Sequence, residues 1–370
     1  MSVDRAKARG TERGLVVLPT GTGKTTVFSE IARRHLDAEG SGVLVLAHRD
    51  ELLTQAAERL ELMVPGERVG IEGGPRSCAG GERIVVAGVQ SIGRPHSVRL
   101  AWFRPDLLII DEAHHAAAES YQNVMRRFGA YSGDCFTLGV TATDHRLDNK
   151  PLSGTDQSIF QECLYRLTLR EAIGDGWLCP LRGYRVTGAA DLSGVKSTAG
   201  DYNVGQLAKA VNTPAQTKAA LDQWGELAED RRTVVFCVDV EHAKDVADAF
   251  RERGVSAEAV DGSMKRADRD GAMARFRNGA TQVLTNCELI TEGVDVPEIA
   301  CVLLLRPTKS WSLFTQMVGR GLRLAPGKAD CLVIDVVDAT DTHRLDDRPG
   351  VAGLVGLPPK LSLKGRTVSE

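Results

Sequence analysis

The sequence predicts an α/β protein with two parallel-sheet domains in tandem. Its 370 residues exceed the roughly 100–200 residues of one typical domain. Short apolar runs rich in β-branched residues and leucine alternate with longer helical patterns, which is typical of βαβ units in a parallel sheet. The alternation is clear in both halves of the chain and weakens between residues 144 and 232. We therefore expect two domains with a cleft between them.

The first half contains five strand candidates without polar alternation, as expected for strands that are buried on both faces. They are residues 15–18, 43–47, 84–87, 107–110 and 136–140. Residues 50–62 place Leu53, Ala56 and Leu60 near helical spacing, which predicts an amphipathic helix between two of these strands.

The second half repeats this organisation. Its strand candidates are residues 234–238, 257–260, 282–285, 301–305 and 331–336. Residues 240–253 place Val240, Ala243, Val246, Ala247 and Phe250 on one helical face. That spacing predicts a helix packed on the second sheet.

The segment between the halves is richer in glycine, serine, threonine and aspartate. Residues 191–203 predict an exposed loop, and Asn212-Thr213-Pro214 predicts the cap of a following helix. After Asp338 the chain is polar and rich in proline and glycine, as in a tail. We expect the first domain at residues 1–175, the second at 176–340 and a C-terminal tail at 341–370.

The composition, with 42% hydrophobic and 26% charged residues, is that of a globular protein. No apolar run approaches the roughly 18–20 residues of a membrane helix, and no signal peptide opens the chain. The eight cysteines are scattered without a C-x-x-C pair, which favours buried, reduced thiols in a cytoplasmic protein. With a formal charge of −3, any surface that binds nucleic acid must be a local basic patch.

The segment LPTGTGKTT, residues 18–26, has the form of a phosphate-binding loop between a strand and a helix. Gly21 and Gly23 allow backbone N–H groups to point at phosphate oxygens near the helix N-terminus. Lys24 would reach the β- and γ-phosphates, and the Thr25 hydroxyl would ligate Mg²⁺. Leu18 stands where the strict G-x-x-x-x-G-K-[ST] pattern has its first glycine. The expected nucleotide-binding residues here are Thr20, Gly21, Thr22, Gly23, Lys24, Thr25 and Thr26.

Asp111 and Glu112 directly follow the apolar strand LLII. A carboxylate at the carboxyl end of a parallel strand faces the crevice in which such sheets bind ligands. We expect Asp111 to hold Mg²⁺ and Glu112 to position and deprotonate the attacking water. A competing interpretation is a metal site that adds His114 and His115. Adjacent histidines do not supply the i, i+4 spacing that zinc prefers on a helix.

The segment QMVGRGLR, residues 316–323, places Arg320 and Arg323 three positions apart in the second half. An always-charged guanidinium suits the charge of a transferring phosphoryl group. Met317 and Leu322 lie among these arginines and favour a helix docked at a domain face. The two halves together predict a nucleotide held from both sides, which is typical of a motor.

These segments together resemble the superfamily 2 helicases and translocases. Within that superfamily the chain resembles the DEAD/DEAH-box branch, which includes excision-repair helicases and the motor subunits of type I and III restriction enzymes. Further blocks follow in the order of the family, over residues 14 to 340: LAHRDELLTQ, VVAGVQSI, VTAT, VVFCVDVEHA and NCELITEGVDVPEI. The resemblance implies two RecA-like domains, ATP and Mg²⁺ in the cleft between them, and a nucleic-acid partner.

The resemblance also assigns roles to single residues. His114, Thr141 and Thr143 match the elements that couple hydrolysis to the grip on nucleic acid. Gly293 and Asp295 match the nucleotide-sensing block of the second domain. In the last motif the resemblance implies that Gln316 and Arg320 contact the site and that Arg323 is the arginine finger.

Contact with nucleic acid is implied at five positions that match family blocks: Arg49, Gln90, Ser91, Thr285 and Asn286. In the family these contacts go mainly to the sugar-phosphate backbone, so no sequence specificity is expected. For each of these residues a cap or a solvated loop is an equally good interpretation. We expect DNA rather than RNA as the partner.

The chain departs from the family pattern at three places. The family has an adenine-reading glutamine segment before the phosphate loop, and here only residues 1–13 precede the first strand, so we expect a late start or a truncation. Asp144 follows TAT where this branch has proline. We expect no accessory nuclease or specificity domain after the second domain.

The expected function is that of an ATP-dependent nucleic-acid helicase or translocase. One alternative is a double-strand DNA translocase that does not separate strands. Another is a phosphotransferase that uses the phosphate loop on a small molecule, and a third is a truncated relative that binds nucleic acid with little turnover. ATP hydrolysis that does not respond to nucleic acid would favour the phosphotransferase.

Overall fold

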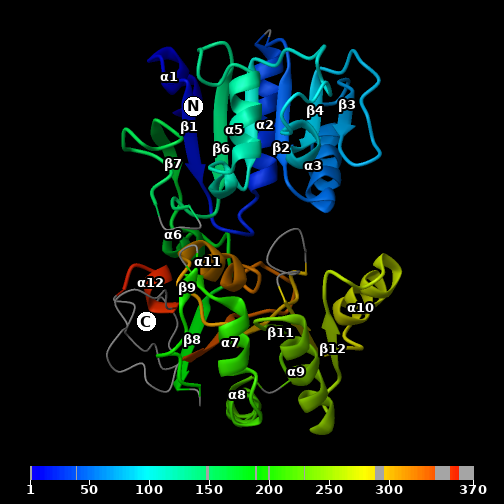
Figure 1. The fold of residues 1–370 in the computed structure, drawn as a ribbon, viewed down its shortest axis with the longest axis vertical. Helices are drawn as coiled ribbons and strands as arrows, with labels where there is room; N and C mark the ends of the chain where they lie inside the picture. Colours follow the sequence, from blue (N-terminus) through cyan, green and yellow to red (C-terminus); the bar gives the residue numbers. More distant parts are fainter. Residues whose placement is uncertain are drawn as a thin grey trace. The chain divides into compact units, whose positions relative to one another are not determined.

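The computed structural model of the chain describes residues 2–38, 40–146, 150–187, 190–198, 201–228, 230–287, 296–337 and 351–357. The chain divides into two compact units (Figure 1). Unit 1 comprises Met1–Pro19 and Gly23–Leu167, and unit 2 comprises Thr20–Thr22 and Thr168–Glu370. Each unit has one all-parallel sheet with helices packed on it, so the predicted α/β class is confirmed. The domain limits expected from the sequence stay predictions.

Unit 1 contains a seven-stranded sheet in the order β3-β4-β2-β5-β6-β1-β7. Its strands are β1 (Arg13–Val17), β2 (Val43–Ala47), β3 (Val69–Glu72), β4 (Ile84–Gly88), β5 (Leu107–Asp111), β6 (Phe136–Thr141) and β7 (Glu162–Arg166). Its helices are α1 (Ser2–Ala8), α2 (Lys24–Asp37), α3 (Asp50–Met63), α4 (Val89–Ile92), α5 (Glu119–Arg127) and the short 3₁₀ helix η1 (Ala113–His115).

The strands of unit 1 are apolar at successive positions because helices cover both faces of the sheet. Along β2, Val43 and Val45 pack into the core that contains α2 and α3. Leu44 and Leu46 pack into the opposite core, with α4 and α5. All five residues of β2 are therefore buried, which explains why its sequence shows no alternation of polar and apolar residues.

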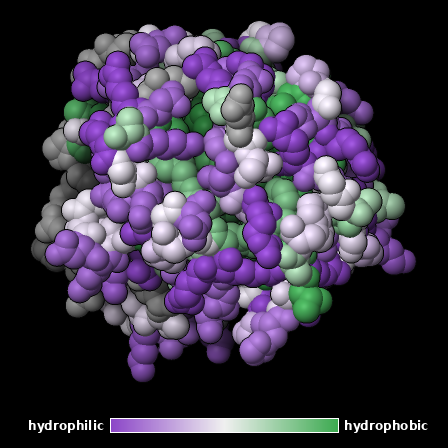
Figure 2. Space-filling model, turned by 90° about the horizontal axis from the view of Figure 1, so that it is seen from above, coloured by the Kyte–Doolittle hydropathy of each residue, from purple (hydrophilic) through white to green (hydrophobic). Residues whose placement is uncertain are grey.

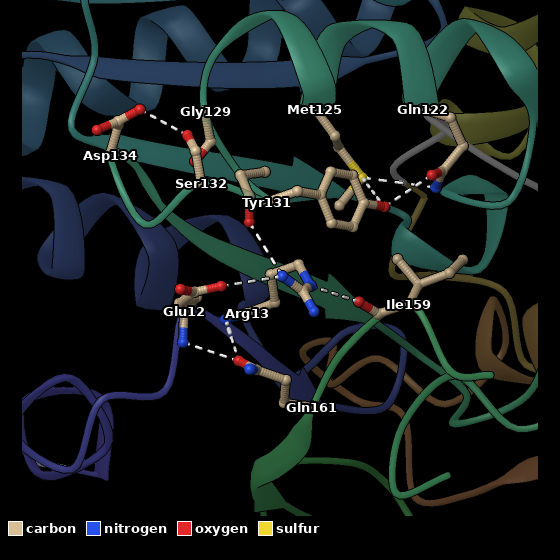
Figure 3. A network of polar contacts seen from close by, with 11 residues as sticks. Glu12, Arg13, Gln122, Met125, Gly129, Tyr131, Ser132, Asp134, Ile159 and Gln161 are labelled. Atoms are coloured by element: carbon tan, nitrogen blue, oxygen red, sulfur yellow. Dashed lines mark hydrogen bonds and ion pairs between the residues drawn. The ribbon is translucent and has the colours of Figure 1, made fainter. Parts of the chain in front are cut away.

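The amino end of β1 is fixed by a network of polar contacts around Arg13 (Figure 3). The Arg13 side chain donates to the carbonyls of Ala130 at 3.1 Å and Ile159 at 3.0 Å. Its guanidinium also lies 4.7 Å from the centre of the Tyr131 ring. One half-buried arginine therefore ties β1 to the loops that precede β6 and β7.

Unit 2 contains a six-stranded sheet in the order β12-β13-β11-β14-β15-β8 and a separate two-stranded ribbon. The sheet strands are β8 (Leu181–Thr187), β11 (Thr233–Phe236), β12 (Ala257–Val260), β13 (Val283–Asn286), β14 (Cys301–Leu304) and β15 (Cys331–Val337), and the ribbon strands are β9 (Ser197–Thr198) and β10 (Asp201–Tyr202). The helices are α6 (Leu169–Gly174), α7 (Val204–Val211), α8 (Pro214–Leu227), α9 (Val240–Glu252), α10 (Arg266–Asn278), α11 (Trp311–Gly319) and α12 (Val351–Leu354).

All ten expected strands are present, with limits that differ by at most two residues. The helix predicted after Asn212-Thr213-Pro214 is α8, whose N-cap Thr213 accepts from the Gln216 N–H. The sequence did not indicate the edge strands β3, β7 and β8. The prediction of an exposed loop at 191–203 was wrong in part, because the β9–β10 ribbon lies there and Tyr202 is buried.

The surface and the thiols agree with a globular protein. The face in Figure 2 is mainly hydrophilic, with scattered hydrophobic residues. In the described part of the chain, no helix is long and apolar enough to cross a bilayer. The eight cysteines, all of them in the described part of the chain, form no disulfide, and five of them are buried. Burial raises the pKa of the Cys301 thiol to about 12, so this thiol is unreactive.

Candidate nucleotide site and arginine segment

Three neighbouring strands of unit 1 end at the same edge of the sheet, and each leads into a segment that contains candidate site residues. β6 pairs with β5 on one side and with β1 on the other, all in parallel. The carboxyl ends of these strands lead to Thr141, Asp111 and the phosphate loop, respectively. Carboxyl ends of parallel strands are where open α/β sheets bind their ligands. The fold therefore brings the predicted first-domain residues to one edge of one sheet.

The phosphate loop has the backbone that its glycines predict. Gly21 and Gly23 have φ angles of 91° and 84°, in the region that favours glycine. Gly23 is the N-cap of α2 and has no side-chain cap, so the first N–H groups of this 14-residue helix have no capping side chain. These groups and the helix dipole suit a phosphate. The Thr26 hydroxyl accepts from Arg59 of α3 at 2.8 Å, an interaction that the sequence did not predict.

Lys24, Asp111 and Glu112 form a buried charged cluster beside this loop. Lys24 Nζ lies 3.7 Å from Glu112 Oε1, and both side chains are about one-tenth exposed. The Glu112 N–H donates to Asp111 Oδ1 at 2.9 Å. Burial, with the adjacent Glu112 charge, raises the pKa of Asp111 to about 7. Two buried carboxylates against one ammonium leave a site that a bound cation would stabilise.

The competing metal site of Asp111, Glu112, His114 and His115 is not formed. Among the described residues, no group of three or more histidine, cysteine, aspartate or glutamate side chains could hold a metal ion. The donors present instead fit Mg²⁺, which is bound by one or two protein oxygens and completes its shell with phosphate oxygens and water. Asp111 and the Thr25 hydroxyl are the residues that would hold it.

The three residues expected to couple hydrolysis to nucleic-acid binding lie together. His114 Nδ1 is 3.4 Å from Glu112 Oε2 and 3.3 Å from Thr141 Oγ1. The Thr143 N–H donates to the same Thr141 hydroxyl at 3.3 Å. A continuous polar path thus runs from Glu112 to Thr143. His115 contacts His114, with ring centres 4.1 Å apart.

Asp144, which replaces the proline of the family pattern, forms ion pairs. Its carboxylate contacts His145 Nδ1 at 2.5 Å and Arg166 of β7 at 2.6 Å. The hydrogen bond with His145 lowers the pKa of Asp144 and raises that of His145. Asp144 therefore links the segment that contains Thr141 and Thr143 to the edge strand β7.

The predicted nucleic-acid contacts differ between the two units. In unit 1, Arg49 is the N-cap of α3, and the exposed Gln90 donates to the His48 carbonyl at 2.6 Å. Ser91 Oγ accepts from the Gly74 N–H at 3.2 Å. Arg49 follows β2 and Gln90 follows β4, and these strands are neighbours. These three residues therefore belong to the same edge of the sheet as the phosphate loop.

The structure does not support side-chain contacts to nucleic acid from Thr285 and Asn286. Both side chains are fully buried. Thr285 Oγ1 donates to the Ala243 carbonyl at 2.6 Å, and Asn286 Nδ2 donates to the Val235 carbonyl at 2.9 Å. In this conformation both side chains serve the packing of β13 against β11 and α9. Gly293 and Asp295 lie outside the described residues.

The arginine segment is built around the end of α11. Ser310 caps the helix by accepting from the Leu313 N–H, Gln316 lies within the helix, and Arg320 is its C-cap. A helix is present as predicted, but it ends at Gly319, so Arg323 follows the helix; its docking at a domain face stays a prediction. Gly321 packs so closely that a Cβ there would lie 2.4 Å from Cys331 Sγ and 2.7 Å from Val302 Cγ2. Arg320 and Arg323 are thus carried by backbone that lies directly on the second sheet.

Lys328, which no sequence motif indicates, binds the backbone of this segment. Its ammonium donates to the carbonyls of Gly321, Arg323 at 2.7 Å and Pro297 at 3.1 Å. The Leu322 carbonyl accepts from the Cys179 N–H at 2.8 Å. A lysine after a Pro-Gly turn is an ordinary surface pattern, so the sequence carries no signal for this role.

Comparison with known protein families gives two matches in succession along the chain. Residues 2–146 match the family model described as type III restriction enzyme, res subunit. Residues 216–325 match the helicase conserved C-terminal domain. Apart from Thr20–Thr22, the first match falls on unit 1, and the second falls on unit 2.

Curated relatives are longer than this chain. The protein named "Putative ATP-dependent helicase IRC3" from Saccharomyces cerevisiae is 35% identical over 96% of this chain and 51% of its own length. The protein named "Putative mitochondrial ATP-dependent helicase irc3" from Schizosaccharomyces pombe is 34% identical over 93% of this chain and 57% of its own length. The chain therefore spans little more than half of these relatives.

Among solved structures, a fragment of a "putative HsdR subunit of a type I restriction enzyme" from Vibrio vulnificus aligns with a TM-score of 0.70. It is 26% identical and covers 99% of this chain and 68% of its own. The two sheets of the present chain are thus those of tandem RecA-like domains. The family models, relatives and fold agree with the motifs: the chain belongs to the superfamily 2 helicases.

Proposed function

We propose that this chain is a nucleic-acid-dependent ATPase that moves on or unwinds DNA. The observation that carries the proposal is the cluster at the start of α2. There, Lys24 Nζ lies 3.7 Å from Glu112 Oε1, and the Glu112 N–H donates a hydrogen bond to Asp111 Oδ1. Uncapped helix N–H groups, a lysine and two carboxylates are the parts that phosphoryl transfer to water requires.

Each residue of the cluster has a distinct role in the proposal. The N–H groups from Gly21 to Thr26 bind the phosphates, and Lys24 neutralises the β- and γ-phosphate charge. Glu112 orients the attacking water and takes up its proton. Mg²⁺, when bound by Asp111 and Thr25, would supply positive charge to the β- and γ-phosphate oxygens. Its charge would also favour the ionised form of Asp111, whose pKa burial otherwise raises to about 7.

The second unit contributes the arginine segment in this proposal. Arg323 is proposed as the arginine finger, with Arg320 as a second γ-phosphate contact and Gln316 beside them. The sequence pattern supports these roles. The close packing of Gly321 on β14 and β15, which positions residues 320–323, is compatible with them. Gly293 and Asp295 remain proposed nucleotide-sensing residues.

DNA is the proposed partner, bound mainly through its backbone. The similarity to restriction-enzyme subunits supports DNA over RNA. Arg49, Gln90 and Ser91 are the proposed contacts in unit 1. The compartment stays a prediction: the sequence favours the cytoplasm, whereas the name of the Schizosaccharomyces pombe relative places that protein in mitochondria.

ATP hydrolysis with and without nucleic acid tests the proposal. We expect turnover to rise at least tenfold with single-stranded or duplex DNA, and Lys24→Ala to abolish it, because the γ-phosphate loses its cation. ATP turnover that is the same with DNA, with RNA and without nucleic acid would favour a small-molecule phosphotransferase instead. No turnover under any condition would favour a non-catalytic binding protein.

A helicase and a double-strand translocase are distinguished by two displacement assays. Displacement of a strand from a duplex indicates unwinding. Displacement of a triplex-forming strand without strand separation indicates translocation along intact duplex.

A further inference from the structure

A group of three arginines lies on unit 1 at a place that the proposed site does not use. The group, which we call the arginine surface, consists of Arg104, Arg126 and Arg127. Arg104 lies three residues before the amino end of β5, and Arg127 is in the last turn of α5. The phosphate loop follows the carboxyl end of β1 instead. The arginine surface therefore extends toward the amino ends of the strands, away from the carboxyl ends at which the phosphate loop lies.

Hydrogen bonds hold the two chain segments of this surface side by side. The Asn123 side chain of α5 donates to the Gly93 carbonyl at 3.2 Å and accepts from Arg126 at 3.2 Å. Farther along α5, Arg127 donates to the Arg99 carbonyl. Residues 93–104 thus run beside α5, which lies on the front of unit 1 in Figure 1.

The charges of the arginine surface are not paired with carboxylates in the part of unit 1 that the structure describes. None of its three arginines forms an ion pair with a carboxylate of the described residues, whereas the neighbouring Arg99 pairs with Glu72. The acidic residues on the same helix and chain segment are Glu119, in the first turn of α5, and Asp106, which binds His35. Burial and the charge of Arg104 both lower the pKa of Arg127, so like charges lie close together.

The dipole of α5 explains only part of this arrangement. Basic residues in the last turn of a helix are favourable, which accounts for Arg126 and Arg127. It does not account for Arg104, which donates to the carbonyls of Ala101 and Phe103 outside the helix. An arginine held beside another arginine without a carboxylate fits a surface that meets an external anion.

An exposed aromatic ring lies in the same segment. Trp102 is 45% exposed, and its ring packs edge-on against Phe103 with centres 5.2 Å apart. One face of a tryptophan fixed in this way is a platform on which a nucleic-acid base stacks. The carbonyl contacts of Arg104 place its guanidinium beside the backbone of this tryptophan.

We propose that the arginine surface and Trp102 bind a single-stranded segment of the polynucleotide, separately from Arg49, Gln90 and Ser91. Guanidinium groups bind phosphates through paired N–H donors, and the indole ring stacks a base. An acidic protein segment would satisfy the arginines but would have no use for the tryptophan. The inference rests on the proposed function, since it assigns a second contact area for the same partner.

Equilibrium binding of a single-stranded oligonucleotide without ATP tests this inference. We compare the full chain with R104A/R126A/R127A over a range of salt concentrations. Loss of three phosphate contacts is expected to reduce the slope of log K against log salt by about 2, and to weaken binding at low salt at least tenfold. W102A is expected to weaken binding about tenfold with an unchanged slope.

Two matched variants control for charge and for folding. R68A/R170A/R266A removes three exposed arginines from other parts of the chain and is expected to keep the slope within about 0.5 of the unmodified chain. R104K/R126K/R127K keeps the charge and is expected to retain most of the slope. Lysine variants that bind as poorly as the alanine variants, with lowered melting temperatures in both, would mean loss of fold and overturn the inference.

The outcomes separate this inference from the proposed function. If the unmodified chain does not bind the oligonucleotide at any salt concentration, the proposed function itself fails. If it binds and the two triple alanine variants lose the same affinity, only the arginine surface is refuted. Unchanged oligonucleotide binding with lost binding of a polyglutamate peptide would also refute it, in favour of an acidic protein partner.

Discussion

Glu112 has an unusual backbone for its residue type. Its φ of 49° and ψ of 54° lie in the left-handed region, which costs a residue with a Cβ about 1 kcal/mol or more. In return its side chain lies against Lys24 and close to His114. Strain that orients a buried carboxylate toward a phosphate-binding loop is typical of a catalytic position.

A first prediction concerns the charge of this residue. Glu112→Gln keeps the size of the side chain and removes its ability to accept a proton. We expect stimulated ATP turnover to fall about 100-fold or more, while the affinity for ATP stays within a few-fold. Steady-state turnover and equilibrium binding of ATP measure the two effects. Turnover within threefold of the unmodified chain would show that another group activates the water.

A second prediction concerns His242, a buried histidine of α9 in unit 2. The Val238 N–H donates to its Nδ1 at 3.3 Å, so the ring is held neutral. Burial lowers the pKa of His242 from 6.5 to about 4. Between these two values the unfolded chain binds a proton that the folded chain does not, so stability falls as the pH decreases from 6.5 toward 4.

His242→Asn removes the titration and keeps an acceptor near the Val238 N–H. We expect the unmodified chain to lose about 2 kcal/mol more than this variant between pH 6.5 and 5. Denaturant unfolding of both proteins, followed by a signal from unit 2, measures the difference. Equal losses in the two proteins would mean that His242 is protonated in the folded state.

At the scale of elements, the arginine segment depends on a lysine outside its motif. Lys328 donates to three carbonyls around Gly321 and Arg323. These carbonyls lie outside α11, which ends at Gly319, and a backbone carbonyl without a partner in a helix or strand is stabilised by a donor such as an ammonium group. The backbone that carries Arg320 and Arg323 is therefore fixed from the side of β15.

A third prediction follows for this positioning residue, on the premise that the arginines complete the nucleotide site. Lys328→Ala is expected to lower stimulated kcat about tenfold with little change in ATP affinity, because the phosphate loop before α2 binds ATP. Lys328→Arg should recover most of kcat. If Lys328→Ala lowers the melting temperature and leaves kcat unchanged, the lysine only stabilises the fold.

The elements differ in how well the sequence predicts them. Strands such as β2 and β5 are buried on both faces, and their unbroken apolar runs are unmistakable. Edge strands such as β7, whose residues are half-buried or exposed, carry no such run and were missed. Ribbon β9–β10 has two residues in each strand, too few to produce any periodicity.

The candidate site was predictable to a similar degree. The residues from Thr20 to Thr26, Asp111 and Glu112 follow central strands, so strand order brings them together. The burial of the Thr285 side chain was not predictable from its position at the end of a strand. When helices cover both faces of a sheet, the side chains of a strand are buried on either face. Arg59 and Lys328 act through contacts between distant parts of the chain, which leave no local pattern.

At the scale of the whole molecule, the two sheets carry complementary halves of one proposed site. Gly23, Lys24 and the two carboxylates belong to unit 1, whereas Thr20–Thr22 of the phosphate loop and the arginine segment belong to unit 2. A nucleotide bound by both halves would connect hydrolysis to relative motion of the units. The chain spans 51% and 57% of two curated relatives, and it is the part that contains both halves.

The most direct test of this account is the stimulated ATP turnover of Arg323→Ala. We expect turnover with saturating DNA to fall about 1,000-fold, as for loss of an arginine finger, with ATP and DNA still bound. Lys24→Ala, measured beside it, should lose ATP binding as well. Stimulated turnover retained in Arg323→Ala would contradict a nucleotide site completed by the second unit.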